Sequence, residues 1–251
     1  MIDFVGAGPG AADLITLRGK ELIEGADIII YAGSLVNPEL LGYAGENCRI
    51  YNSASMTLEE VLGVMKEGHR NGKRVVRLHT GDPSIYGAIK EQMDALDREE
   101  IEYRVCPGVS SLFAAAAALK AEYTLPGVSQ SLIVTRMEGR TAVPEKESIE
   151  AFAAHGSSMV VFLSAGMLEE LTKRLIKGGY REDTPAAIVY RASWEDERVI
   201  RTRVSELYAK AVENNISRQA LIVVGDFLGS DYELSRLYDP AFSHGYRRAE
   251  K

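Results

Sequence analysis

The chain has 251 residues, of which 46% are hydrophobic and 26% are charged, a balance typical of a soluble globular protein and not of a disordered, fibrous or coiled-coil chain. The formal net charge of −7 excludes an overall positive field that would draw the protein to nucleic acid or to an anionic membrane. The two cysteines are far apart and the four histidines lack metal-ligand spacing, so we expect no metal site. Neither a signal peptide nor a bilayer-spanning run is apparent, and we therefore expect a cytoplasmic protein.

The first half of the chain alternates short apolar strands with helices. Strands are predicted at 2–5, 27–31, 49–51, 74–78 and 103–106, and helices at 14–24, 37–43, 57–69, 86–96 and 110–119. Thr57, followed three residues later by Glu60, forms the pattern of a capping box at a helix start. This alternation predicts a parallel sheet built from βαβ units.

The rhythm changes near residues 124–127. After this point, strands are predicted at 129–135, 158–163, 186–190, 198–203 and 221–225, and helices at 144–154, 167–177 and 204–214. Because segment 192–197 is too short for a crossover helix, the strands on either side of it should be antiparallel. We therefore predict an α/β fold of two domains, 1–123 with a mostly parallel sheet and 124–228 with a mixed sheet, followed by a peripheral tail over 229–251.

Loops of small residues follow three predicted strands of the first domain. They are Gly6-Ala7-Gly8-Pro9-Gly10, Gly81-Asp82-Pro83-Ser84 and Pro107-Gly108-Val109-Ser110-Ser111. Glycine lets the backbone approach a ligand closely, and ligands of open α/β sheets bind at the carboxyl ends of the strands. Each loop alone is also compatible with a plain tight turn. In the second loop, Ser84 could then cap the helix that follows. Three such loops in one domain predict a ligand site.

Familiar nucleotide and hydrolase motifs do not fit these loops. A dinucleotide fingerprint needs GxGxxG, whereas here the glycines fall at 6, 8 and 10, and Pro9 removes an amide donor. The loop of open-sheet methyltransferases fits superficially, but that fold has a helical segment before its first strand. Neither GxSxG nor GxxxxGK[ST] occurs, which argues against an α/β-hydrolase and a P-loop nucleotidase.

The three loops together resemble those of the tetrapyrrole methylases, which use S-adenosylmethionine. The runs 31–36 (YAGSLV) and 135–141 (TRMEGRT) resemble the branch that methylates carbon 11 of precorrin-4 or cobalt-precorrin-4 in cobalamin biosynthesis. The resemblance covers about residues 2–228. It implies two α/β domains with the cofactor between them, S-adenosylhomocysteine as a product, a small-molecule tetrapyrrole substrate and a homodimer.

The resemblance also implies which residues hold the cofactor. Carried over by motif, they are Gly8, Pro9, Thr80, Gly81, Asp82, Ile85, Ser110, Ser111, Leu163, Ala192 and Ala220. The last three rest on looser motifs and are also compatible with core packing, and Leu163 stands where the family often has methionine. A sulfonium methyl group is already activated, so no enzyme nucleophile is needed. No catalytic residue is assigned, although Tyr86 and Asp82 are candidates for a general base.

A precorrin carries several carboxylates, which a protein of net charge −7 must hold with local cations. Arg136 and Arg140 follow a predicted strand, and arginine can bind a carboxylate through two parallel hydrogen bonds. Both are predicted substrate ligands, unless they pair with Glu138 or Glu145. Arg77 and Arg191 are the alternatives.

Two other functions remain open at this point. One is methyl transfer to another corrin carbon or another tetrapyrrole, and the second is a non-catalytic module that binds a ligand. Intact glycine loops in both halves of the expected cofactor cleft argue against the second function. A family branch that acts on a translation factor or on RNA is disfavoured by the negative charge and by the absence of a basic, aromatic stripe.

Overall fold

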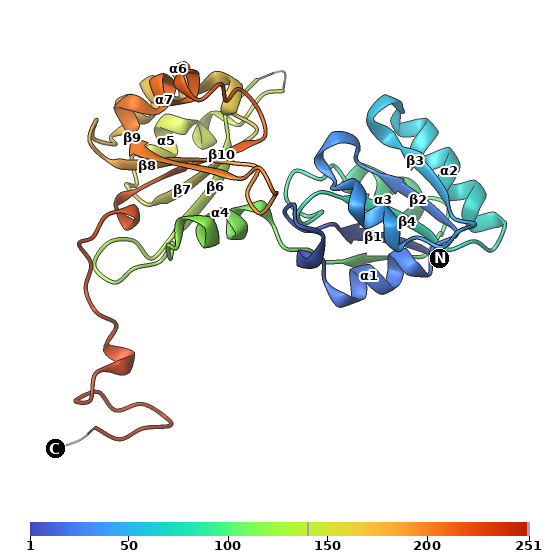
Figure 1. The fold of residues 1–251 in the computed structure, drawn as a ribbon, viewed down its shortest axis with the longest axis horizontal. Helices are drawn as coiled ribbons and strands as arrows, with labels where there is room; N and C mark the ends of the chain where they lie inside the picture. The colour runs from blue at the N-terminus through green and yellow to red at the C-terminus, as the bar shows by residue number, and fades with distance from the viewer. Residues whose placement is uncertain (140, 250–251) are drawn as a thin grey trace. The chain divides into compact units, whose positions relative to one another are not determined.

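The computed structural model describes residues 1–139 and 141–249. The chain divides into two compact units: unit 1 comprises residues 1–115 and 191–197, and unit 2 comprises residues 116–190 and 198–251 (Figure 1). This division differs from the boundary expected at residue 124, because segment 116–123 is tied to unit 2. There the carbonyl of Leu119 accepts a hydrogen bond from Arg201, and that of Tyr123 accepts one from Ser158 Oγ at 2.6 Å. The limits 1–123, 124–228 and 229–251 stay a prediction.

Unit 1 is built on a sheet of five parallel strands. They are β1 (Ile2–Gly6), β2 (Ile28–Tyr31), β3 (Arg49–Asn52), β4 (Val75–His79) and β5 (Tyr103–Cys106), in the order β3-β2-β4-β1-β5. The predicted parallel sheet is confirmed. Because β1 lies between β4 and β5, the loops that follow these three strands begin side by side.

Both faces of the unit 1 sheet are covered, which explains its continuous apolar strands. The helices are α1 (Leu17–Glu24), α2 (Leu58–Arg70) and α3 (Lys90–Asp97), with a 3₁₀ helix at Pro38–Tyr43. One buried cluster contains Ile2 and Phe4 of β1 with residues of α2 and α3. A second contains Val5 of β1 with Ile23 of α1 and Leu40. Alternate residues of β1 thus serve two cores.

The predicted capping box at the start of α2 is confirmed. Thr57 Oγ1 accepts a hydrogen bond from the amide of Glu60 at 3.2 Å, and the Glu60 carboxylate accepts one from the amide of Thr57 at 2.7 Å. Replacing Thr57 with alanine should lower the free energy of unfolding by about 1 kcal/mol, since one amide of the first turn loses its acceptor. Urea titration measures this. Thr57→Ser keeps the hydroxyl and serves as the control; equal stability of the two variants would contradict the assigned cap.

Unit 2 contains a mixed sheet, as predicted. Its strands are β6 (Leu132–Arg136), β7 (Ser158–Phe162), β8 (Pro185–Tyr190), β9 (Arg198–Arg203) and β10 (Ala220–Val224), in the order β6-β7-β10-β8-β9. Only β6 and β7 are parallel; β10 is antiparallel to both neighbours, and the predicted antiparallel pairing of β8 with β9 is confirmed.

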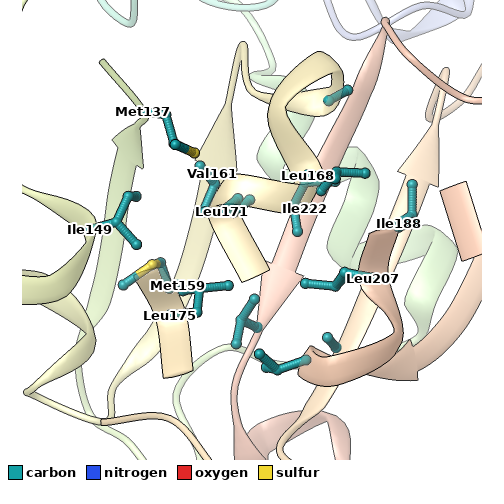
Figure 2. Close-up of a cluster of buried hydrophobic side chains, with 14 of the residues drawn as sticks. Met137, Ile149, Met159, Val161, Leu168, Leu171, Leu175, Ile188, Leu207 and Ile222 are labelled. Carbon is teal, nitrogen blue, oxygen red and sulfur yellow. The ribbon is translucent and has the colours of Figure 1, made fainter. Parts of the chain in front are cut away.

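Helices α5 (Ile149–Ala153), α6 (Leu168–Gly178) and α7 (Leu207–Glu213) form the core of unit 2 with this sheet. Figure 2 shows their apolar side chains meeting those of the strands: Leu171 and Leu175 of α6 and Leu207 of α7 lie close to Met159 and Ile222. All five are completely buried. The unit therefore has its own hydrophobic core.

Four helices, α1, α3, α5 and α7, begin three or more residues later than expected from the sequence; α7 begins at Leu207, after a 3₁₀ helix at Val204–Glu206. In each case a local feature fixes the start. Helix α1 begins after Thr16, which caps it, and α5 begins after Ser148, which caps it in the same way. Helix α3 begins only at Lys90, because Tyr86 and Ala88 have φ values of 56° and 50°, which no helix accommodates.

The described residues contain two free cysteines, Cys48 and Cys106. Within the same ranges, no three His, Cys, Asp or Glu side chains are grouped so that they could hold a metal ion. Among the helices at 1–139 and 141–249, none combines the length and the apolarity that crossing a membrane requires.

Candidate functional site

Three loops meet at the carboxyl edge of the unit 1 sheet. We name them the glycine loop (residues 6–10), the aspartate loop (80–88) and the serine loop (107–111), after strands β1, β4 and β5. In the register of the sheet, Gly6 pairs with His79, and Val5 pairs with Cys106. The structure therefore brings together the three loops from which the sequence predicts a ligand site.

The loops pack against one another backbone to backbone, and glycine is required for this. A Cβ atom on Gly108 would lie 2.2 Å from the carbonyl oxygen of Gly81, and one on Gly6 would lie 2.5 Å from Cα of Gly108. Gly8 and Gly81 have φ values of 78° and 62° and exchange two hydrogen bonds, of 3.2 and 2.8 Å. The first role of these glycines is thus to let the three loops come together.

The backbone groups of the glycine loop are largely paired within unit 1. The amides of Ala7 and Gly8 donate to carbonyls of the neighbouring strand and loop, Pro9 has no amide hydrogen, and the amide of Ala11 donates to Ser193 Oγ at 3.1 Å. A phosphate-binding loop needs free amides aimed at the anion. This loop instead presents small, buried residues, which suits a ligand held by shape and neutral contacts.

Segment 191–197 covers the glycine loop. Trp194 Nε1 donates to the carbonyl oxygen of Pro9 at 3.2 Å, and a Cβ atom on Gly10 would lie 2.3 Å from Trp194 Cδ1. The Arg191 guanidinium lies 4.2 Å from the centre of the Trp194 ring and pairs with Asp196 at 2.6 Å. In this segment the sequence indicated Ala192, which is buried at 5% exposure, and Arg191 as an alternative substrate ligand, whereas Trp194 was missed. The sequence signal that could have drawn attention to Trp194 is that it is the only tryptophan of the chain.

Asp82 ties the aspartate loop to the serine loop. Its Oδ2 accepts a hydrogen bond from the amide of Gly108 at 2.8 Å, and its Oδ1 accepts from the amide of Ser84 at 2.9 Å and from the Ser84 hydroxyl. Burial alone raises the pKa of this carboxyl, but the hydrogen bonds from Ser84 and Gly108 outweigh it and hold the pKa below its usual value. Asp82 is therefore an ionised carboxylate that holds the two loops together through hydrogen bonds, and it is a poor general base. Ser84 does not cap α3, because it belongs to this turn.

The other predicted residues of unit 1 surround this junction. Gly81 faces the serine loop, where an added Cβ would lie 3.5 Å from Cα of Ser110 and 3.6 Å from the amide of Ser111. Ser110 is buried, whereas Thr80 and Ile85 are partly exposed and line a pocket of the same unit.

The predicted residues of unit 2 lie at the same end of three neighbouring strands of its sheet. Arg136 ends β6, Leu163 follows the end of the parallel neighbour β7, and Ala220 begins the antiparallel strand β10. Continuing the β7–β10 register, in which Ile222 pairs with Val161, puts Ala220 opposite Leu163. Leu163 has a φ of 54° and is 65% exposed, which is inconsistent with core packing, whereas Ala220 is buried.

Arg136 organises the loop that follows it. Its Nη1 donates to the carbonyls of Met137 and Thr141 at 3.0 and 3.2 Å, and its Nη2 donates to the carbonyl of Ala142 at 3.0 Å. Glu138, a possible partner on sequence grounds, pairs with Arg174 at 2.6 Å. Arg140, the second predicted substrate ligand, lies outside the described residues.

Comparisons with known proteins agree with this arrangement. The model of the Tetrapyrrole (Corrin/Porphyrin) Methylases matches residues 1–208. The cobalt-precorrin-4 C(11)-methyltransferase of Methanocaldococcus jannaschii is 55% identical over 98% of this chain and 96% of its own length. A solved structure of a cobalt-precorrin-4 methyltransferase superposes with a TM-score of 0.89 at 44% identity, covering 91% of this chain and 96% of the other. A uroporphyrin-III C-methyltransferase from Thermus thermophilus, solved with S-adenosylhomocysteine, has a TM-score of 0.76 at 27% identity, covering 90% and 92%.

Proposed function

Since the chain belongs to the tetrapyrrole (corrin/porphyrin) methylases, we propose that it methylates carbon 11 of cobalt-precorrin-4 or precorrin-4, with S-adenosylmethionine as the methyl donor, in cobalamin biosynthesis. The observation that carries this proposal is the similarity at 55% identity to a C(11)-methyltransferase along almost the whole of both chains. The three loops at adjacent strand ends provide the physical support.

The residues present fit the cofactor. When bound, S-adenosylmethionine supplies a methyl group already activated by the sulfonium charge. The protein must then hold and align its ligands, a contribution of about 7 kcal/mol or more to lowering the barrier. We assign this role in unit 1 to Gly8, Pro9, Thr80, Gly81, Asp82, Ile85, Ser110, Ser111 and Ala192, and in unit 2 to Leu163 and Ala220. Asp82 acts here by fixing the serine loop through Gly108.

The cellular location and the assembly remain proposals. Two free thiols in Cys48 and Cys106 suit a reducing, cytoplasmic compartment. A homodimer is supported by the family, and Val105 and Phe113 are apolar side chains with 45% and 59% exposure that an interface would cover. Light scattering of the purified protein measures its mass directly.

The experiment that tests the function is one incubation of the purified protein with ¹³C-methyl S-adenosylmethionine. Cobalt-precorrin-4, precorrin-4 and uroporphyrinogen III are offered separately. We expect a single ¹³C-methyl signal at carbon 11 with one of the first two. A methyl group at another carbon, or on uroporphyrinogen III alone, contradicts the proposal and favours another tetrapyrrole methylation; no transfer to any of them favours a binding module.

Replacing Arg136 with methionine should raise the dissociation constant of the tetrapyrrole about 10- to 100-fold, the loss expected for a hydrogen bond to a charged group. A guanidinium has five N–H donors, and within residues 1–139 and 141–249 Arg136 donates three of them, all to its own loop, so two can serve a substrate carboxylate. Binding of S-adenosylhomocysteine should stay within about twofold. Fluorescence titration measures both constants.

The matched control is Arg203→Met, which removes the same charge at the opposite edge of the unit 2 sheet. Hydrogen exchange over residues 137–142 reports whether the loop itself has loosened. Unchanged tetrapyrrole binding in Arg136→Met would remove Arg136 from the substrate site.

A further inference from the structure

A pocket of about 280 Å³ lies in unit 1 beside the aspartate loop. Its walls come from the ends of β2 and β4, from Met56 and Leu58, from the aspartate loop and from the first turn of α3. It shares Thr80 and Ile85 with the proposed cofactor site. The volume is below the range of about 300–1,000 Å³ for drug-sized ligands, so the pocket suits one arm of a tetrapyrrole and not the whole macrocycle.

The pocket contains a buried cation without a carboxylate partner. Arg77 is 7% exposed; its Nε donates to Gln92 Oε1 and its Nη1 to the carbonyl of Ile30, both at 3.2 Å. Gln92 is itself fixed by a 3.0 Å hydrogen bond to the carbonyl of Ala88. Among the described residues, no Asp or Glu forms an ion pair with Arg77, and the two groups that accept its hydrogen bonds, Gln92 Oε1 and the carbonyl of Ile30, are both neutral.

Burying the charged guanidinium of Arg77 costs desolvation free energy, which an anion bound beside it would offset. Burial lowers the pKa of Arg77 to about 10, so the guanidinium is still charged at neutral pH. Removing a charge from water costs several kcal/mol, and a carboxylate with good geometry is what repays the cost. The only carboxylate of the lining, that of Glu91, belongs to an exposed residue.

A second polar group of the lining is also without a partner. His79 is 4% exposed, and its Nε2 is buried and makes no hydrogen bond within the part of the chain that the structure describes. Val75, Arg77 and His79 alternate along β4, so both polar side chains lie on the same face of the sheet. Burial, together with the charge of Arg77, lowers the pKa of His79 to about 3, and a neutral imidazole can donate one hydrogen bond.

We propose that this pocket binds one carboxylate arm of the tetrapyrrole, with Arg77 as its charged ligand and His79 as a second ligand. The inference rests on the proposed function, and it assigns to Arg77 and His79 the role of positioning residues. Because the pocket shares Thr80 and Ile85 with the proposed cofactor site, an arm anchored there holds the macrocycle next to the methyl donor.

Two molecules in the reaction carry carboxylates: the tetrapyrrole and the amino-acid end of the cofactor. The cofactor carboxylate stands beside its own ammonium group, and Arg77 would repel that cation in a buried pocket. The acetate and propionate arms of a precorrin have no adjacent cation. The charge pattern therefore favours the tetrapyrrole.

The test measures two dissociation constants in three variants of the full chain. Arg77→Met removes the charge, Arg77→Lys keeps the charge without the planar fork, and His79→Phe keeps the ring without its nitrogens. Arg49→Met, at an exposed position of the same unit, is the control for net charge. The probes are uroporphyrin III, a stable tetrapyrrole with carboxylate arms, and S-adenosylhomocysteine.

For Arg77→Met we expect the dissociation constant of uroporphyrin III to rise about 10- to 100-fold, for Arg77→Lys and His79→Phe about 3- to 20-fold, and for Arg49→Met less than about twofold. S-adenosylhomocysteine should bind all four within about twofold. Weakened cofactor binding with tetrapyrrole binding intact assigns the pocket to the cofactor and overturns the proposal, as does unchanged binding of both. If Arg77→Met does not fold, Arg77→Lys and His79→Phe decide. The ¹³C incubation of the wild type tests the function itself, so failure of the pocket assignment and failure of the function are distinguished.

Discussion

Gly108→Ala is expected to destabilise unit 1 by about 3 kcal/mol and to weaken binding of S-adenosylhomocysteine more than about tenfold. The added methyl group would lie 2.2 Å from the carbonyl oxygen of Gly81 and 2.7 Å from Cα of Gly6. Both neighbours are backbone atoms, one in the aspartate loop and one at the end of β1, and backbone atoms cannot turn aside as a side chain can. The serine loop must therefore move away from the other two loops, and the surface they build together is lost.

Urea titration and calorimetry measure the two effects of this change. The control is Gly63→Ala, the same chemical change at an exposed position of α2 with no atom within 4 Å of the added Cβ. There alanine should stabilise the protein by about 0.5–1 kcal/mol, because glycine is a poor helix residue. If both variants behave alike, the close packing of the three loops has no bearing on the site.

Asp82→Asn is expected to cost about 2–3 kcal/mol of stability and to reduce turnover. Asparagine has one acceptor oxygen, so it can serve either Ser84 or the amide of Gly108 while its NH₂ group meets the other donor. The variant thus loses the tie between the aspartate and serine loops with almost no change in volume. Wild-type stability with normal turnover in this variant would show that the tie is dispensable.

The pH dependence of stability gives a second measurement for Asp82. Its folded-state pKa is lowered below the ordinary value of 3.8, so folding favours the ionised form. The advantage of the wild type over Asp82→Asn should be complete above about pH 5 and should disappear as the pH falls below 3.8 through the folded pKa. An advantage that is constant from pH 7 to pH 2 would contradict the role of the charge.

Sequence patterns predicted the layout of the site better than its details. Short apolar runs alternating with helices predicted the parallel sheet, and strand ends predicted that the loops after β1, β4 and β5 would meet. The start of α3 was not predictable, because the positive φ values of Tyr86 and Ala88 are imposed by packing and not by residue type. Arg77 was named from the sequence only as an alternative substrate ligand, and His79 was missed, because in a strand buried on both faces periodicity does not distinguish a polar pocket from a core.

The packing of segment 191–197 against the glycine loop could not be predicted from local sequence patterns. Ser193 and Ala11, which share a hydrogen bond, are 182 residues apart in the chain, and no local pattern announces such a contact. The sequence did mark Ala192, but only through family resemblance. Trp194, the side chain nearest to the position that a Cβ on Gly10 would take, belongs to segment 192–197, which was interpreted as too short for a crossover helix.

The same segment bears on how the protein is made. Residues 1–115 leave the ribosome first, yet unit 1 also needs residues 191–197. At about 5–20 residues per second, synthesis from residue 116 to residue 197 takes roughly 4–16 s. During that interval the nascent unit 1 has its sheet but not its tryptophan, and Gly10 is open to water. The last step in completing this half of the enzyme therefore waits for a hairpin of the other half to be translated.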